Sequence, residues 1–166
     1  MDPMTRTLIL LRHGKSAYPD DVDDHERPLS PRGRREAGLA GRWIRANLPE
    51  VDAVLCSTAT RTRKTLAEAA VEAPVEYRDS LYHADPESLV AEIRGTADDV
   101  QTLLVIGHEP TLSATVLGLI TDHSTDAAHQ VAEKFPTSAI AVLTVSGSWS
   151  ELSRGTAELV DFHIPR

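Results

Sequence analysis

Short uninterrupted apolar runs occur along the chain at residues 8–11 and 103–106. A run of this kind is typical of a β-strand that is buried on both faces of a sheet. The first of these strands is expected to end near Arg12. Further strands are predicted at residues 51–56, 75–77, 139–145 and 157–162. The connection between the last two begins at a predicted turn formed by Gly147 and Ser148.

Stretches with helical periodicity separate these runs. Ser30 followed by Pro31 is a favourable helix start, because the serine hydroxyl can cap the helix and proline suits the first helical position. The apolar positions that follow at helical spacing are Ala37, Ala40, Ile44 and Leu48. Pro49 is expected to end this helix. Other helices are predicted over residues 60–71, 86–93 and 110–119.

The alternation of strands and helices predicts a three-layer α/β/α fold with a mostly parallel central sheet. A length of 166 residues is expected for one domain, which would span residues 1–166. Ligands of such folds bind beyond the carboxyl ends of the strands. Residues 18–27 are rich in aspartate and lack apolar periodicity, so they predict a long solvated loop; they also lack the spacing of a calcium-binding loop.

Charge and composition exclude several classes of partner. The chain has 25 acidic and 17 basic residues, a net charge of −8, which disfavours long-range attraction to nucleic acid or to an anionic membrane. Its apolar runs are far shorter than the roughly 18 residues of a spanning helix, and the N-terminal residues lack the layout of a secretory signal. The single cysteine, Cys56, fits a reducing compartment. We therefore expect a cytoplasmic protein.

Three polar clusters lie at predicted strand ends and suggest phosphate chemistry. They are Arg12-His13-Gly14, residues 57–61 with Arg61, and Gly107-His108-Glu109. Arginine presents a planar fork of donors that matches phosphate oxygens. A histidine that is neutral near pH 7 can attack phosphorus or exchange a proton. Gly14 is expected to let the backbone approach the ligand closely.

Each member of this set also has a simpler explanation. His13 could be a hydrogen-bonded turn residue, Arg61 a solvated charge in a first helical turn, and His108 a partner of a backbone carbonyl. The three clusters together are better evidence than any one residue. Gly14-Lys15-Ser16 also matches the end of a nucleotide-binding P-loop, but that motif requires glycine where this chain has Ile9.

No cofactor or metal site is expected. No dinucleotide-binding glycine motif follows a strand, and there is no metal-binding motif. Four other histidines are predicted to be surface residues: His25, His83, His123 and His129. Trp43 and Trp149 are too scattered to form a stacking platform for single-stranded nucleic acid, and Trp43 is expected to pack in the core.

The three clusters together resemble the motifs of the histidine phosphatase superfamily, which is also called the phosphoglycerate mutase-like superfamily. The string from Leu11 to Ser16 resembles its RHG signature. Residues 57–62 with Thr65 are similar to its second-arginine motif, and residues 107–110 to its second-histidine motif. The loop at residues 24–30 and the short chain resemble the SixA-like branch, whose namesake removes phosphate from phosphohistidine on signalling proteins. The resemblance spans about residues 7 to 120 and implies the phosphoglycerate mutase-like fold.

The resemblance implies a role for each matching residue. His13 would be the nucleophile that becomes phosphorylated, and Arg12, Arg61 and His108 would surround the phosphoryl group and stabilise its charge. Ser16 would either add a hydroxyl contact to the phosphate or serve as a cap or turn residue. Arg27 would either reach the substrate or form an ion pair with Asp23 or Asp24, and the ion pair is favoured.

The proton donor is less well defined. An alcohol leaving group needs a general acid, and the candidates are Glu109, Asp85 and Glu87, of which Glu109 is favoured. Asp85 before Pro86 is also a good helix cap, and Glu87 is a good first-turn carboxylate. If none of them acts, the substrate would be a phosphoramidate such as phosphohistidine, which makes less demand on acid catalysis.

The leading hypothesis is therefore a metal-independent phosphatase that works through a phosphohistidine intermediate at His13. Its substrate would be a phosphorylated protein or a small phosphorylated metabolite, and it would act as a monomer. One alternative is a phosphate-transferring mutase, although a short chain leaves little room to exclude water from the site. Another is a non-catalytic binder of phosphorylated ligands.

Overall fold

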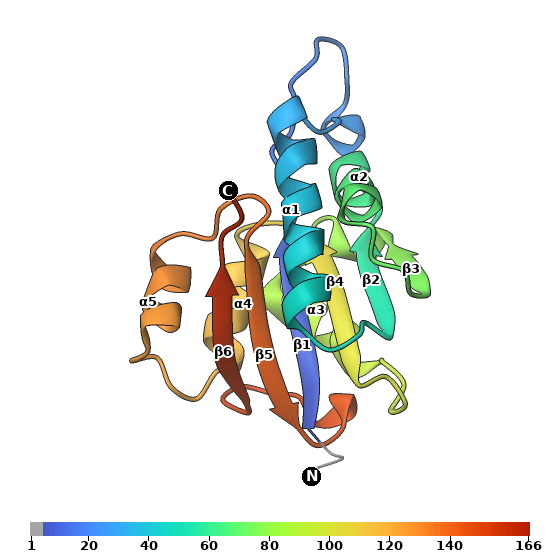
Figure 1. Cartoon of the computed structure of the whole chain (residues 1–166). Helices are drawn as coiled ribbons and strands as arrows, with labels where there is room; N and C mark the ends of the chain where they lie inside the picture. Colours follow the sequence, from blue (N-terminus) through green and yellow to red (C-terminus); the bar gives the residue numbers. More distant parts are fainter. Residues whose placement is uncertain (1–4) are drawn as a thin grey trace.

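The computed structural model of the chain describes residues 5–166. Residues 1–4, which carry part of the prediction about a secretory signal, lie outside this range. A six-stranded sheet forms the centre, in the order β3-β2-β4-β1-β5-β6 (Figure 1). Its strands are β1 (Thr5–Arg12), β2 (Ala53–Ser57), β3 (Val75–Arg78), β4 (Thr102–Gly107), β5 (Ile140–Ser146) and β6 (Ala157–His163). The four strands from β3 to β1 are parallel, whereas β5 and β6 are antiparallel to their neighbours, so the predicted mostly parallel sheet is confirmed.

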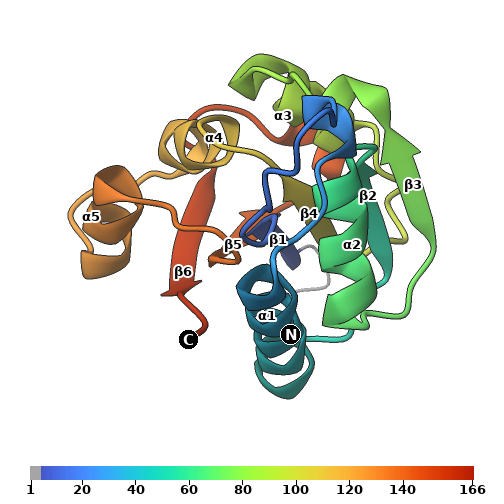
Figure 2. The same cartoon turned by 90° about the horizontal axis from the view of Figure 1, so that it is seen from above.

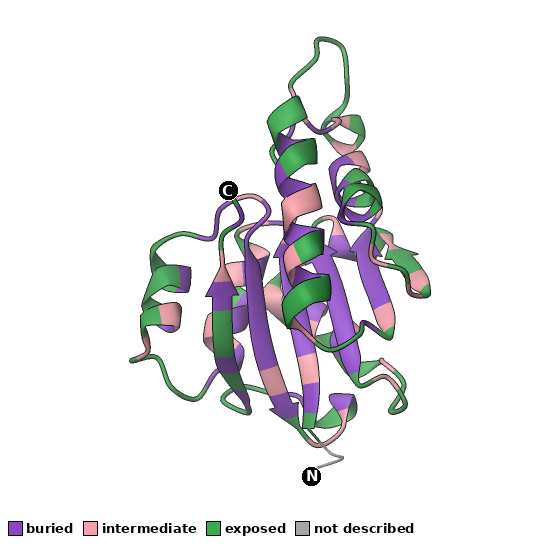
Figure 3. Cartoon of the chain, viewed as in Figure 1, coloured by how far each residue is buried: buried purple, intermediate pink, exposed green. Residues whose placement is uncertain are grey.

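Helices cover both faces of this sheet, as the alternating pattern predicts. One face is covered by α1 (Pro31–Asn47) and α2 (Thr60–Ala69). The other is covered by α3 (Pro86–Arg94), α4 (Thr111–Leu119) and α5 (Asp126–Glu133), as Figure 2 shows from above. Ile9 and Leu11 pack into the core on the α1 side, while Leu8 and Leu10 pack into the core on the α4 side. Because β1 is buried on both faces (Figure 3), its apolar run is uninterrupted.

The local signals at α1 and α2 explain where these helices begin and end. The Ser30 hydroxyl accepts a hydrogen bond from the Gly33 N–H at 3.0 Å, so the predicted cap of α1 is confirmed. Helix α2 ends at Ala69, two residues before the predicted end, because Ala70 adopts a left-handed conformation with φ 55°. Strand β2 begins at Ala53, two residues after the predicted start.

Helix α5 was not predicted, because the segment around His123 and His129 reads as polar. Its start nevertheless carries a capping signal, since the Thr125 hydroxyl accepts a hydrogen bond from the Ala128 N–H at 3.1 Å. Its buried residues are Ala128 and Val131, so its short apolar face is easily overlooked.

The two tryptophans have different environments. Trp149 is fully buried, and its indole N–H donates to the Val100 carbonyl at 2.8 Å. Trp43 is only partly buried. It packs against the core on the α1 side as expected, and its ring also stacks on His163 with centroids 4.5 Å apart.

Strands β1, β2 and β4 are parallel, so they end at the same edge of the sheet. Their last residues are Arg12, Ser57 and Gly107, and the predicted polar clusters therefore meet at this edge. None of the helices within residues 5–166 is both long and apolar enough to cross a membrane.

Candidate functional site

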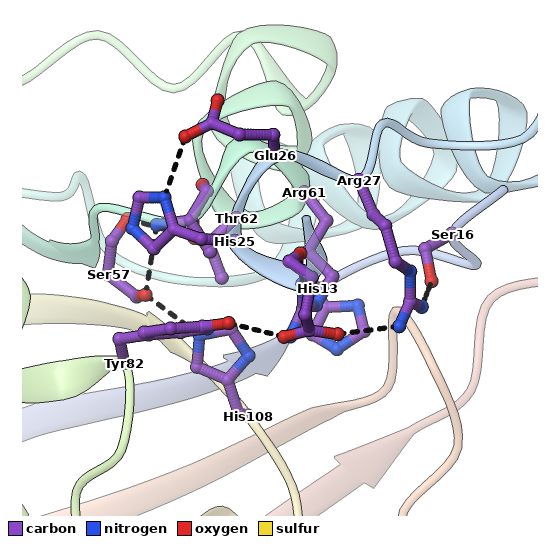
Figure 4. A network of polar contacts seen from close by, with 12 residues as sticks. His13, Ser16, His25, Glu26, Arg27, Ser57, Arg61, Thr62, Tyr82 and His108 are labelled. Carbon is purple, nitrogen blue, oxygen red and sulfur yellow. Dashed lines mark hydrogen bonds and ion pairs between the residues drawn. The ribbon is translucent and has the colours of Figure 1, made fainter. Parts of the chain in front are cut away.

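The three polar clusters enclose a cavity of about 250 Å³ beyond the carboxyl ends of the central strands. Figure 4 shows the side chains that converge there from different elements. The cavity is small and strongly cationic. Its lining residues are Arg12, His13, Lys15, Ser16, Tyr18, Arg27, Arg61, His108, Glu109 and Thr137.

His13 has one ring nitrogen held by the backbone. Its Nδ1 lies 2.7 Å from the Gly14 carbonyl oxygen. A carbonyl can only accept a hydrogen bond, so Nδ1 carries the proton and Nε2 of the neutral ring keeps its lone pair. His13 is buried, and this burial lowers its pKa to about 3. The neutral ring that nucleophilic attack requires is thus the stable form near pH 7.

His108 lies beside His13, with ring centroids 5.3 Å apart. Its Nε2 lies 2.8 Å from the Ser57 hydroxyl oxygen, so its partner is a side chain and not the backbone carbonyl considered from sequence. Burial lowers the pKa of His108 to about 4, and the charge of Arg61 contributes in the same direction. The Ser57 hydroxyl therefore orients the second histidine at the site.

Arg12 is half-buried at the end of β1. Its Nη1 donates to the Phe135 carbonyl at 2.9 Å, while its Nε is buried and has no partner among residues 5–166. Burial lowers the pKa of Arg12, and the nearby Glu109 acts against this shift. A buried guanidinium N–H without an acceptor is costly, and an oxyanion in the cavity is of the right chemistry to relieve that cost.

Arg61 is buried in the first turn of α2 and is not the solvated charge considered from sequence. Its Nη1 donates to the Asp24 carbonyl at 2.8 Å, and its Nη2 donates to Asp24 Oδ2 at 3.1 Å. Its guanidinium is therefore held by the loop that precedes α1.

Ser16 and Arg27 contact one another at the rim of the cavity. Arg27 donates to the Ser16 hydroxyl through Nη2 and to Asp24 Oδ1 through Nη1, the latter at 2.7 Å. The predicted ion pair between Arg27 and Asp24 is confirmed. Arg27 also lies over the exposed ring of Tyr18, 4.0 Å from its centroid. Arg27 thus lines the cavity and forms an ion pair at the same time.

The three candidate proton donors differ in position. Glu109 lines the cavity, but its Oε1 accepts from the Ser113 N–H at 2.6 Å and its Oε2 from the Ser113 hydroxyl at 2.7 Å. Asp85 caps α3 by accepting from the Ser88 N–H at 2.8 Å, and Glu87 lies in the first turn of that helix. Asp85 and Glu87 line a different groove, between α3 and α4. Of the three, only Glu109 is at the cavity, and both of its oxygens are engaged.

Gly14 packs closely against the start of α1. A Cβ atom at Gly14 would lie 2.7 Å from the Gly33 carbonyl oxygen, so the position needs glycine because the loop packs against the start of α1. The Gly14 N–H donates to the Thr65 hydroxyl at 2.8 Å. The glycine therefore helps to fix the backbone next to His13, and its expected role in the approach of a ligand stays a prediction.

Two contacts of Asp24 and two of His25 could not be predicted from the sequence. Asp24, in the loop predicted to be solvated, accepts from Arg61 as well as from Arg27, and the Tyr82 hydroxyl also donates to it. His25 is not isolated, because its Nε2 lies 3.0 Å from the Thr58 hydroxyl and its ring meets that of Tyr82 edge-on. The contacts of Asp24 with Arg61 and Tyr82 and of His25 with Thr58 join residues 33 to 58 positions apart, so no local spacing indicates them.

Three further histidines lie on the surface, as predicted: His83, His123 and His129 are exposed. Within residues 5–166, no three histidine, cysteine or carboxylate side chains gather in a way that would hold a metal ion.

Comparison with known proteins agrees with this geometry. Residues 8–88 match the profile of the Histidine phosphatase superfamily (branch 1). An uncharacterised protein of Mycobacterium tuberculosis is 58% identical over 158 residues, which are 94% of this chain and 100% of that protein. A Nakamurella multipartitia structure assigned as phosphohistidine phosphatase SixA has a TM-score of 0.90 and 41% identity, covering 97% of this chain and 96% of that one.

A structure of the protein histidine phosphatase SixA complexed with tungstate is also similar. It has a TM-score of 0.78 and 26% identity, and the match covers 96% of this chain and 97% of that one. The fold, the motifs in their order and these relatives agree. The chain therefore belongs to the histidine phosphatase superfamily, in its SixA-like branch, and is a phosphatase.

Proposed function

We propose that this phosphatase hydrolyses phosphohistidine on a protein, with His13 as the nucleophile. The observation that carries the proposal is the hydrogen bond from His13 Nδ1–H to the Gly14 carbonyl, at 2.7 Å. It fixes the neutral tautomer whose Nε2 lone pair is free to attack phosphorus.

The reaction takes place in two transfers. In the first, Nε2 of His13 forms a bond to phosphorus while the bond from phosphorus to the substrate ring nitrogen breaks. The substrate ring is protonated on its other nitrogen, so it leaves as neutral imidazole. In the second, water attacks phosphorus, the bond to His13 breaks, and phosphate and one proton are released. Because Nδ1 keeps its proton against Gly14, His13 also leaves as neutral imidazole.

Cationic and polar groups around His13 fit the charge of the transferring phosphoryl group. Phosphoryl transfer depends mainly on positioning and on electrostatic stabilisation of the equatorial oxygens. Arg12 and Arg61 supply guanidinium donors at the cavity, and His108 supplies a ring nitrogen held by Ser57. Ser16 and Arg27 lie at the rim. All of these residues come from one chain, so we expect a monomer to be active.

The state of Glu109 favours phosphohistidine over a phosphoester. It is the only carboxylate that lines the cavity among residues 5–166, and both of its oxygens accept hydrogen bonds from Ser113. An alkoxide leaving group needs a proton from an acid at the site. A protonated imidazole leaving group carries its own proton, so it leaves without such an acid. The similarity to the SixA structures supports the same substrate class.

The test compares the wild-type protein and His13→Ala on two substrates, a phosphohistidine protein and a chromogenic phosphate monoester. We expect wild-type turnover to be faster on the phosphohistidine protein, to persist in excess chelator, and to be lost in His13→Ala. His129→Ala, at an exposed position of α5, is the matched control and should retain full activity. Turnover that survives in His13→Ala would refute the nucleophile, and a clear preference for the monoester would refute the substrate class.

A further inference from the structure

One carboxylate in the loop before α1 is bonded to both arginines at the mouth of the cavity. Asp24 Oδ1 accepts from Arg27 at 2.7 Å, and Oδ2 accepts from Arg61 at 3.1 Å. The Asp24 carbonyl accepts from Arg61 as well, at 2.8 Å. No other carboxylate within residues 5–166 forms an ion pair with either arginine.

The phenol of Tyr82, which lies in a distant part of the sequence, completes this group. The Tyr82 hydroxyl donates to Asp24 Oδ2. The Tyr82 ring meets His25 edge-on at 4.6 Å between centroids and lies 5.6 Å from the His108 ring, and Figure 4 shows it beside that histidine. Tyr82 follows β3, so its contact with Asp24 connects the loop to a separate part of the fold.

We propose that Asp24 is a positioning residue of the phosphatase reaction, which holds Arg61 and Arg27 in the orientation that the transferring phosphoryl group requires, with Tyr82 fixing Asp24 in turn. This inference rests on the proposed function. Asp24 acts through the two arginines and does not itself contact the reacting atoms.

The physical reason is the flexibility of arginine. A free arginine side chain loses rotamer entropy when it is ordered. Two hydrogen bonds from Arg61 to Asp24 order the guanidinium before the substrate arrives, so less of this cost is incurred at the transition state. The hydrogen bond from Tyr82, followed by the charges of the two arginines, lowers the pKa of Asp24 to about 2, and the residue is an anion at neutral pH.

The negative charge of Asp24 makes it possible to distinguish a positioning role from simple support of the fold. An anion beside the cavity repels a bound oxyanion, so Asp24 weakens ground-state binding while it organises the arginines for the transition state. Removal of its charge should therefore change binding and catalysis in opposite directions. A residue that only supports the fold would weaken both.

The test uses Asp24→Asn, which keeps the shape of the side chain and removes its charge. We expect kcat on the phosphohistidine protein to fall roughly 10- to 100-fold, a size typical of a misplaced catalytic group. Tungstate, measured by calorimetry as a phosphate mimic, should bind at least as tightly as it binds the wild-type protein. Tyr82→Phe should show the same pattern with a smaller fall in kcat.

The matched control is Asp20→Asn, an exposed carboxylate of the same loop, which should change neither quantity. An unchanged kcat in Asp24→Asn would overturn the inference, and so would a fall in kcat accompanied by weaker tungstate binding. If His13→Ala is inactive, either of these two results for Asp24→Asn would overturn the role of Asp24 and leave the proposed function intact. Activity in His13→Ala would instead contradict the proposed function.

Discussion

Strand β1 carries an arginine near each of its ends, and the two arginines have different surroundings. Arg6 lies at the amino end and is buried. Its Nη1 donates to the Gly147 carbonyl, its Nη2 donates to the Asp98 carbonyl at 2.7 Å, and the Asp98 carboxylate lies 4.0 Å away. Arg12 lies at the carboxyl end, and within the described part of the chain its guanidinium makes one hydrogen bond, from Nη1 to the Phe135 carbonyl.

The difference shows how one residue type joins segments of the fold at one end of a strand and lines a cavity at the other. Among residues 5–166, neither Nε atom has a hydrogen-bond partner and both are buried, so the terminal nitrogens make the distinction. The terminal nitrogens of Arg6 donate hydrogen bonds to carbonyls of two other segments. These bonds join those segments to the sheet. Arg12 faces a cavity that it shares with His13 and Arg61, and it keeps donors for a ligand.

Substitution of Arg12 is expected to have the largest effect. Arg12→Lys keeps the charge but loses the planar fork that can bind two oxygens. We expect kcat/KM to fall about 10³-fold, in line with the loss of one preorganised donor to a transition-state oxyanion. The free energy of unfolding, measured with urea, should change by less than about 1 kcal/mol, because the substitution affects only the hydrogen bond to the Phe135 carbonyl and lysine can still donate. Near wild-type activity would show that the free donors of Arg12 do not bind the phosphoryl group.

Substitution of Arg6 is expected to show the opposite pattern. Arg6→Met keeps much of the apolar stem but removes the hydrogen bonds to Gly147 and Asp98. We expect the free energy of unfolding to fall by about 3 kcal/mol, because the buried guanidinium loses two hydrogen bonds from a charged donor. In the folded fraction kcat should be unchanged. A variant that remained as stable as the wild-type protein, or one with a reduced kcat, would remove the contrast between the two ends of β1.

The parts of the fold that follow local patterns could be predicted from sequence. The apolar runs of β1 and β4 and the Ser30 cap of α1 depend on neighbouring residues, and their positions were confirmed. The start of β2 was predicted two residues early, because the side chain of Asp52 takes up N–H groups at the start of β4. Its carboxylate accepts from the N–H groups of Gln101 and Thr102, at 3.0 and 2.9 Å, which a one-dimensional pattern does not show.

In the candidate site, too, some residues could be predicted from the sequence and others could not. The residues at strand ends could be found from sequence, because parallel strands bring their carboxyl ends to one edge. Asp24 and Tyr82 could not, because each is defined by a partner far along the chain and lies in a segment without periodicity. The capping role of Asp85 was predicted and is confirmed, since an N-cap depends only on residues within one helical turn.

The pH dependence of stability also tests the comparison between the two ends of β1, and we expect it to show the smallest effect. His13 and His108 are the only buried histidines among residues 5–166, and both lie at the Arg12 end of the sheet. Their pKa values are lowered to about 3 and about 4, so between these values and 6.5 the unfolded chain binds more protons than the folded protein. Stability is therefore lost as the pH falls below 6.5.

Each of these histidines should contribute about 1 kcal/mol of lost stability between pH 6.5 and 5.5, because its unfolded form is already half protonated at pH 6.5. Urea unfolding at pH 6.5 and 5.5 measures this loss. His108→Gln keeps a side chain that can contact Ser57 but does not titrate, and it should lose about 1 kcal/mol less than the wild-type protein. The exposed variant His129→Ala should behave as the wild-type protein does. Equal losses in wild type and His108→Gln would mean that the acid sensitivity arises elsewhere, and the Arg12 end would then differ from the Arg6 end in its ligand-binding donors alone.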